Sequence, residues 1–246
     1  MGKEPTIVRA GDMLYEGKAK QLFLTEDPGV VRVKYKDTAT AFNGEKRAVL
    51  EGKGEMNNRI STFFFRYLNE HGIPNHFIDA ISPLEQLVRK VDIIPLEVVV
   101  RNIAAGTLSK RTGLPEGTEL RHPVVELYYK DDALGDPLIN EDHVSVLQLA
   151  TEEQLKEMRE MALKVNDLLK QLMEQEKILL VDFKLEFGVD AEGKLLLADE
   201  ISPDTCRFWD AKTGEKLDKD RFRRDLGQVV EAYREIWTRL GGKKDV

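Results

Sequence analysis

The sequence predicts an α+β fold with two lobes, a β-rich N-terminal lobe and an α+β C-terminal lobe. Short strand-like runs dominate the first hundred residues, and long helical patterns dominate the second half. The 246 residues are enough for one large domain or for two small lobes that share a cleft. We place the boundary near residues 90–95, which gives an N-terminal lobe of residues 1–92 and a C-terminal lobe of residues 93–246.

The first half contains strand candidates around a single helix. Residues 21–24 and 30–35 are β-type runs separated by Asp27-Pro28-Gly29, a pattern that predicts a hairpin. The polar stretch 36–54 is expected to be a long loop. A helix is predicted over residues 55–71, where apolar residues recur at helical spacing. Further strands are expected at residues 77–81, 84–91 and 96–101.

The second half is more helical. Thr151 and Gln154 are spaced as a capping box, and an apolar stripe behind them predicts a helix of nearly six turns. Residues 179–187 and 195–201 are expected to be strands joined by a tight turn at residues 190–193. A last helix is expected from about Asp218 to Gly241.

The composition is that of an ordinary globular protein. Hydrophobic residues make up 41% and charged residues 33%, and the formal net charge is -7. An acidic chain is a poor match for nucleic acid, which usually requires a basic face. The lone Cys206 indicates a reducing compartment and is interpreted as a small, partly buried side chain. Without a signal-peptide pattern or a spanning apolar run, we expect a cytoplasmic protein with no membrane partner.

Charged residues alternate along the segment 181–188. In a strand, Asp182, Lys184 and Glu186 would share one face, opposite Val181 and three other apolar residues. A solvent-exposed charged face is the simpler interpretation. However, a two-residue hairpin loop would place Lys184 opposite Asp199 and make Glu186 and Asp199 diagonal neighbours. Two carboxylates beside a lysine suit Mg²⁺, although a register shift of one residue would break this alignment.

Two further segments suggest anion binding. Lys18 and Lys20 follow Gly17 at the entry to a strand, where lysines and backbone N–H groups can hold a phosphate. A surface turn with solvated lysines is the alternative, because the sequence contains neither a Walker A loop nor a G-x-G-x-x-G motif. Arg101 ends a strand and leads into small residues and Thr107, which indicates either an anionic ligand or a basic helix start. Arg207 is another candidate phosphate ligand.

Taken together, these segments resemble the phosphoribosylaminoimidazole-succinocarboxamide synthase (SAICAR synthetase) family from Tyr15 to about Leu240. The most specific stretches are residues 94–102 with Ala105-Gly106, and residues 180–188. The resemblance implies a protein-kinase-like ATP cleft between the lobes. It also implies a ligase that joins L-aspartate to the carboxylate of carboxyaminoimidazole ribonucleotide, using ATP and Mg²⁺ in purine biosynthesis, and a homodimer.

The resemblance also implies residue roles. The catalytic residues would be Lys18, Asp182 and Lys184. Lys18 and Lys20 would bind the ATP phosphates, Glu186 and Asp199 would hold Mg²⁺, and the backbone around Arg89 to Val91 would meet adenine. The ribonucleotide would be bound by Arg101, Thr107 and Arg207 at its phosphate, with Asp182 and Lys184 near the reacting group.

Two positions depart from the family pattern. Thr107 stands where serine is usual, which preserves the hydroxyl, and Asn43-Gly44 replaces a frequent Asp-Gly pair, which weakens any carboxylate role there. A small-molecule kinase and a non-catalytic nucleotide sensor are the competing interpretations. Release of ADP only in the presence of an amine would distinguish the ligase from the kinase, and any turnover would exclude the sensor.

Overall fold

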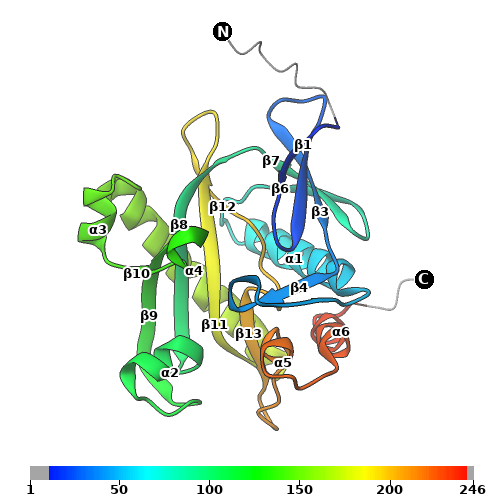
Figure 1. Cartoon of the computed structure of the whole chain (residues 1–246), viewed down its shortest axis with the longest axis vertical. Helices are drawn as coiled ribbons and strands as arrows, with labels where there is room; N and C mark the ends of the chain where they lie inside the picture. The colour runs from blue at the N-terminus through cyan, green and yellow to red at the C-terminus, as the bar shows by residue number, and fades with distance from the viewer. Residues whose placement is uncertain (1–10, 243–246) are drawn as a thin grey trace.

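The computed structural model describes residues 11–242, which contain two large antiparallel sheets and a small two-stranded one (Figure 1). The N-terminal sheet has the strand order β1-β2-β3-β7-β6. Helix α1 (Lys53–Glu70) lies alongside β3, β6 and β7. The strands of this sheet are β1 (Met13–Glu16), β2 (Lys20–Leu24), β3 (Val30–Tyr35), β6 (Phe77–Ser82) and β7 (Glu85–Arg89). The predicted hairpin is confirmed, since β2 and β3 pair directly.

The second sheet contains the longest strands and has the order β10-β9-β8-β11-β12, with β13 paired to β11. Helix α4 (Glu152–Gln175) packs against β8 and β11 and carries the predicted capping box at Thr151 and Gln154. The strands of this sheet are β8 (Asp92–Ile103), β9 (Glu119–Tyr129), β10 (Leu138–Ile139), β11 (Ile178–Val189), β12 (Leu195–Ala198) and β13 (Cys206–Asp210). The predicted α+β class with two lobes is confirmed.

The remaining elements connect or cover the sheets. They are the hairpin of β4 (Thr38–Ala41) and β5 (Lys46–Val49), the helices α2 (Gly106–Thr112), α3 (Glu141–Val146), α5 (Asp220–Arg223) and α6 (Val229–Arg239), and the 3-10 turns η1 (Phe42–Gly44) and η2 (Asp132–Leu134). Buried apolar side chains of α1, α4, α6 and the second sheet form one continuous core cluster. In Figure 1, α1 lies behind the N-terminal sheet, and α6 packs against α1 on the side away from that sheet's upper strands.

The structure corrects two of the predicted elements. Residues 36–54 are not a loop, because β4 and β5 pair within them. In β4 the buried positions of the strand alternation are Ala39 and Ala41. Their small side chains are buried but give little hydrophobic signal in the sequence. The last helix is interrupted between α5 and α6, where Asp225, Gly227 and Gln228 adopt positive φ angles that a helix cannot contain.

The structure also corrects the prediction of which side chains share a face of β11. Its pairing with β13 shifts register between Leu180 and Asp182, as at a β-bulge. Val181 therefore joins a separate cluster with Ile103 and Trp209, whereas Phe183 lies in the main core. The charged side chains of this strand do not form an exposed face, because Asp182 and Glu186 are each only 3% exposed.

Candidate functional site

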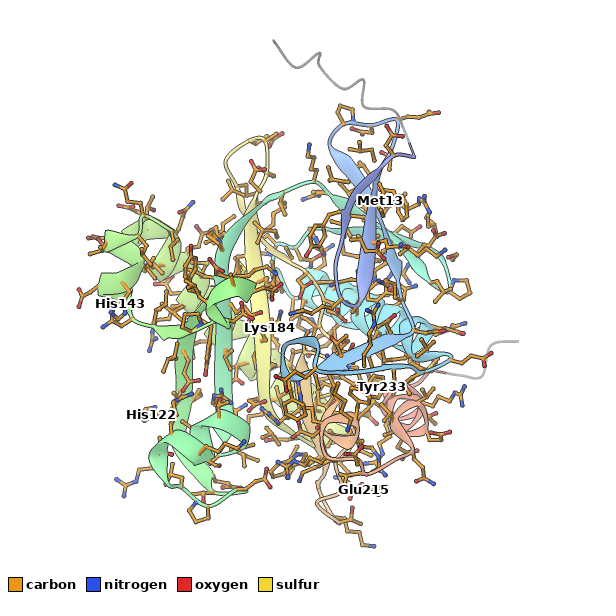
Figure 2. All side chains as sticks on the ribbon, in the orientation of Figure 1. Met13, His122, His143, Lys184, Glu215 and Tyr233 are labelled. Atoms are coloured by element: carbon orange, nitrogen blue, oxygen red, sulfur yellow. The ribbon has the colours of Figure 1, made fainter. Side chains whose placement is uncertain are left out.

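Lys184 on β11 lies between several carboxylates near the middle of the molecule (Figure 2). Its Nζ is 2.6 Å from Glu186 Oε1, 3.1 Å from Glu97 Oε1 and 3.6 Å from Asp199 Oδ2. Burial alone would lower the pKa of Lys184, but Glu186 and Asp199 outweigh it and hold the pKa well above its usual value. Lys184 is therefore a fixed positive charge at neutral pH rather than a base.

Glu186 and Asp199 converge by a different route from the one that the sequence predicts. The connection between β11 and β12 is longer than a two-residue loop, with Val189 paired to Leu195, so Glu186 pairs with Ala198. This one-residue shift alone would separate the carboxylates. However, β12 ends at Ala198, and Asp199 takes a left-handed φ of 59°. That turn directs the Asp199 carboxylate back to Lys184.

The N-terminal sheet contributes Lys20, the first residue of β2. Its ammonium pairs with Asp199 and lies 3.0 Å from Glu200 Oε1. Burial would raise the pKa of Asp199, but Lys20 and Lys184 outweigh it and hold that pKa below its usual value. Asp199 thus stays ionised between one lysine from each sheet. This arrangement is suited to binding phosphate oxygens together with a hard cation.

Lys18 lies apart from this pair. It belongs to the turn between β1 and β2 and makes an exposed ion pair of 2.8 Å with Asp132 of η2. A residue that sequence reasoning missed, Lys130, donates to both carboxylate oxygens of Glu186, at 3.0 Å and 2.9 Å. Lys130 follows the end of β9 and reaches Glu186 past β8, the strand between β9 and β11, which the acidic segment around it does not indicate in the sequence.

A group of arginines lies at the other end of the site. Arg101 on β8 donates to Asp182 at 2.8 Å, to Glu126 at 2.7 Å and to Thr107 at 3.2 Å. Arg207 on β13 also donates to Asp182, at 2.9 Å. Buried Asp182 therefore holds two guanidinium groups side by side, which is a geometry suited to a phosphate group.

Gly106 is required for this arrangement. Its φ is 54°, and a Cβ placed there would lie 2.4 Å from a guanidinium nitrogen of Arg207. Arg207 can therefore rest against the backbone at the start of α2 only because this position has no side chain. Among the small residues between Arg101 and Thr107, Gly106 has this role.

A cavity of about 180 Å³ links the arginine group to Lys184. Its lining comes from β8, β9, β11, β13, the loop before β13, α2 and α5. It includes Glu97, Val99, Arg101, Thr107, Tyr128, Asp182, Phe183, Lys184, Asp204, Thr205, Cys206, Arg207 and Arg223. Sequence reasoning missed Tyr128 and Arg223. The spacing of Glu126 and Tyr128 on β9 could have revealed Tyr128, whereas Arg223 has no pattern of its own. Cys206 is buried, as expected, and burial raises its thiol pKa.

The backbone from Arg89 to Val91, which is predicted to meet adenine, lies at the connection between the two large sheets. Arg89 ends β7 and is exposed, and Val91 precedes β8. A Cβ added to Gly188 would lie 2.5 Å from Val91 Cγ2, so the connection between β7 and β8 passes close to the end of β11. The role of Arg89 and Val91 in adenine binding stays a prediction.

The carboxylates around Lys184 are the candidate ligands for Mg²⁺. Among the residues that the structure describes, no group of three or more His, Cys, Asp or Glu side chains could hold a metal ion. Glu186 and Asp199 offer two carboxylates that face the same lysine. Mg²⁺ characteristically takes one or two carboxylates and completes its shell with water and substrate phosphates. The residues present therefore fit Mg²⁺, bound together with a nucleotide.

The fold and the site define a class of protein, a two-lobed α+β protein whose interior site is lined by lysines and arginines suited to phosphate groups. The SAICAR synthetase family model matches residues 13–240. The chain is 63% identical to a phosphoribosylaminoimidazole-succinocarboxamide synthase of Brevibacillus brevis, over 94% of this chain and 97% of that protein. The chain belongs to the SAICAR synthetase family and is accordingly an enzyme, a ligase.

Solved structures agree with this assignment. A phosphoribosylaminoimidazole-succinocarboxamide synthase from Ehrlichia chaffeensis superposes with a TM-score of 0.93 at 47% identity, covering 95% of this chain and all of that one. A SAICAR synthetase solved in complex with ADP gives a TM-score of 0.92 at 52% identity, covering 96% and 100%. In the part of the chain that the structure describes, no helix is both long and apolar enough to cross a membrane.

Proposed function

We propose that this chain joins L-aspartate to the carboxylate of carboxyaminoimidazole ribonucleotide, with conversion of ATP to ADP and phosphate. The observation that carries the proposal is the position of Lys184. It contacts the carboxylates of Glu186 and Asp199 on one side, and on the other it lines the cavity that contains Arg101 and Arg207. The proposed nucleotide-binding end of the site and its proposed ribonucleotide phosphate end therefore meet at Lys184, which carries a fixed positive charge.

At the nucleotide end, Lys18 and Lys20 would bind the ATP phosphates. The position of Lys20 supports this role, since its ammonium already pairs with Asp199 and Glu200 beside the site. Lys18 would have to leave its exposed partner Asp132, and an exposed ion pair costs little to break. When bound at Glu186 and Asp199, Mg²⁺ would supply further positive charge to the phosphate oxygens. The ADP complex of a related SAICAR synthetase supports nucleotide binding.

At the other end, Arg101, Thr107 and Arg207 would bind the ribonucleotide phosphate. The buried Asp182 carboxylate orients both guanidinium groups toward each other, so its role in this scheme is to fix the substrate's binding groups. The ribonucleotide carboxylate would then lie near Lys184. Lys184 would hold this carboxylate by charge while the γ-phosphoryl group is transferred to it.

The chemistry explains why ATP is needed. Attack by an amine on a carboxylate would have to expel an oxide ion, which is a poor leaving group. Phosphoryl transfer to a carboxylate oxygen forms an acyl phosphate and releases ADP. The aspartate amine then attacks the acyl carbon, phosphate leaves with the C–O bonding electrons, and the nitrogen loses a proton. Positioning and charge neutralisation are the main contributions that a protein makes to such transfers.

The proposal is tested by measuring ADP release from Mg·ATP and carboxyaminoimidazole ribonucleotide, with and without L-aspartate. The ligase requires ADP release to depend on aspartate and a succinyl-carboxamide product to accumulate. Equal release without aspartate would instead support the kinase interpretation or an uncoupled ATPase. ATP binding without turnover would support the sensor interpretation. Homodimeric assembly and a cytoplasmic location stay predictions of the family resemblance, and sedimentation velocity tests the first of these.

A further inference from the structure

Arg223 ends α5 and lines the same cavity as Arg207. Neither the sequence nor the family resemblance assigned it a role. Both guanidinium groups contact one carboxylate, that of Asp220. Arg207 Nε lies 2.9 Å from Asp220 Oδ2, and Arg223 Nη1 lies 2.6 Å from Asp220 Oδ1. The two arginines are therefore set at a fixed spacing by a single side chain.

Asp220 is itself held in place by the strand that carries Arg207. It is 1% exposed, and its backbone N–H donates to Asp218 Oδ1 at 2.7 Å. The other oxygen of Asp218 accepts from the backbone N–H of Phe208 on β13 at 2.8 Å. This connection ties the start of α5 to β13, so Asp220 cannot shift relative to Arg207 without breaking buried hydrogen bonds.

The charge of this group favours an anionic ligand. The guanidinium groups of Arg101, Arg207 and Arg223 share the two carboxylates of Asp182 and Asp220, so these five side chains together keep one positive charge. Burial would raise the pKa of Asp220, but Arg207 and Arg223 outweigh it and hold the pKa below its usual value, so the carboxylate stays ionised. Arginine suits a phosphate ester because its planar group donates two parallel hydrogen bonds.

We propose that Asp220 is a positioning residue that holds Arg207 and Arg223 as a paired clamp, and that Arg223 binds the ribonucleotide phosphate beside Arg207. This inference rests on the proposed function, which gives that phosphate to Arg101, Thr107 and Arg207. It adds one substrate-binding residue and explains why a buried aspartate is placed behind the cavity wall.

The test uses Asp220→Asn and Arg223→Gln in the full chain, with steady-state kinetics for each substrate. Loss of one charge-assisted contact should raise the KM for carboxyaminoimidazole ribonucleotide by roughly tenfold in either variant. The KM for ATP should stay within about twofold, because its phosphates bind at the opposite end of the site. Since Asp220 acts through Arg223, Asp220→Asn should have a smaller effect in an Arg223→Gln background.

Asp210→Asn is the matched control. Asp210 lies on the same strand as Arg207 and pairs with Arg239 at 2.6 Å, yet neither residue lines the cavity. Asp210→Asn should lower the melting temperature without changing the KM for any substrate. If Asp220→Asn behaves like this control, Asp220 is merely structural and the inference is wrong.

Two further measurements separate this inference from the proposed function. Arg223→Gln removes a partly exposed side chain and decides the question even where Asp220→Asn fails to fold. Binding of ribose 5-phosphate, measured by calorimetry, should weaken roughly tenfold in Arg223→Gln and needs no turnover. Unchanged binding overturns the clamp, whereas an unmodified chain that never turns over the ribonucleotide overturns the proposed function.

Discussion

Lys20 on β2 and Asp199 after β12 form an ion pair that joins the two sheets at the candidate site. Both side chains are largely buried, at 14% and 17% exposed, and the second sheet adds Lys184 on the other side of the same carboxylate. A pair buried to this extent costs desolvation free energy that its mutual attraction repays only in part. We therefore expect it to serve ligand binding more than stability.

The first prediction concerns Lys20. Lys20→Gln should reduce kcat/KM for ATP by roughly a hundredfold, because it removes a buried positive charge beside the nucleotide phosphates. Steady-state kinetics with varied ATP provide the measurement. Lys34→Gln is the matched control, since Lys34 is an exposed lysine on the neighbouring strand β3. Equal kinetics for the two variants would remove Lys20 from the nucleotide site.

The second prediction concerns Glu186. Its carboxylate accepts from Lys130 and Lys184, and the side chain is only 4% exposed. Glu186→Gln keeps the shape but removes the charge, so Mg²⁺-dependent turnover should be lost while the circular dichroism spectrum is unchanged. Glu192→Gln, in the exposed loop after β11, should retain full activity. Turnover near the normal rate in Glu186→Gln would remove this residue from the proposed metal site.

The metal preference can also be measured without turnover. Titration of Mg²⁺ in the presence of ADP should stabilise the unmodified chain against thermal unfolding, because ligands that bind only the folded state raise its stability. The added stabilisation by Mg²⁺ should be absent in Glu186→Gln, while any stabilisation by ADP alone should remain. An identical Mg²⁺ effect in both proteins would place the ion elsewhere.

Local patterns predicted most of the fold, and tertiary detail accounts for the errors. The alternation along β11 predicted that Asp182, Lys184 and Glu186 lie together, and all three belong to the candidate site, because strand periodicity is a short-range property. The position of Val181 could not be predicted, since a bulge depends on how a neighbouring strand pairs. The left-handed turn at Asp199 is equally invisible in the sequence, where nothing distinguishes a strand residue from one just beyond the strand.

The site was predicted mainly through the family resemblance. Pattern alone favoured a surface turn for Lys18 and left Arg101 open between an anionic ligand and a basic helix start, because a single sequence does not show which charges face one another. Long-range pairs explain the residues that were missed. Lys130 reaches Glu186 from just beyond the end of β9, and Arg223 meets Arg207 through the Asp220 carboxylate. Such contacts depend on the completed packing of β9, β11 and α5.

The third prediction concerns a buried polar group shared by three elements. Asp204, in the loop before β13, accepts from Lys53 on α1 at 2.6 Å and from the hydroxyl of Tyr233 on α6 at 2.6 Å. Tyr233→Phe should lower the free energy of unfolding by about 1–2 kcal/mol, because one oxygen of a buried carboxylate loses its donor. Lys53→Met should cost more, about 3–5 kcal/mol, since it leaves the Asp204 charge unpaired.

Denaturant unfolding measures both effects. Tyr67→Phe is the matched control, because Tyr67 on α1 is half-buried and its hydroxyl has no hydrogen-bond partner within residues 11–242. It should change the free energy of unfolding by less than about 0.5 kcal/mol. If Tyr233→Phe were no more costly than Tyr67→Phe, the hydrogen bond to Asp204 would contribute nothing to stability.

The fourth prediction concerns the pH dependence of stability at His76. This side chain is 6% exposed, lies 5.1 Å from the Phe65 ring, and its Nε2 has no partner among the described residues. Burial, reinforced by the Lys20 ammonium, lowers the pKa of His76 from 6.5 to about 3. The unfolded chain therefore takes up this proton near pH 6.5, whereas the folded chain does not. Stability from this group is complete above pH 6.5 and falls as the pH decreases toward 3.

The effect is measured as a difference between His76→Gln and the unmodified chain. Between pH 7.5 and 5.5, His76 should remove about 1.4 kcal/mol from the free energy of unfolding, and the variant should lack this loss. Taking the difference cancels other groups that titrate in the same window, such as Asp218, whose pKa is raised to about 7 by burial and by Asp220. His71→Gln is the control, since His71 is exposed. A difference that does not change with pH would mean that folded His76 is protonated as readily as the unfolded one, and that the imidazole is less well shielded from water than its packing indicates.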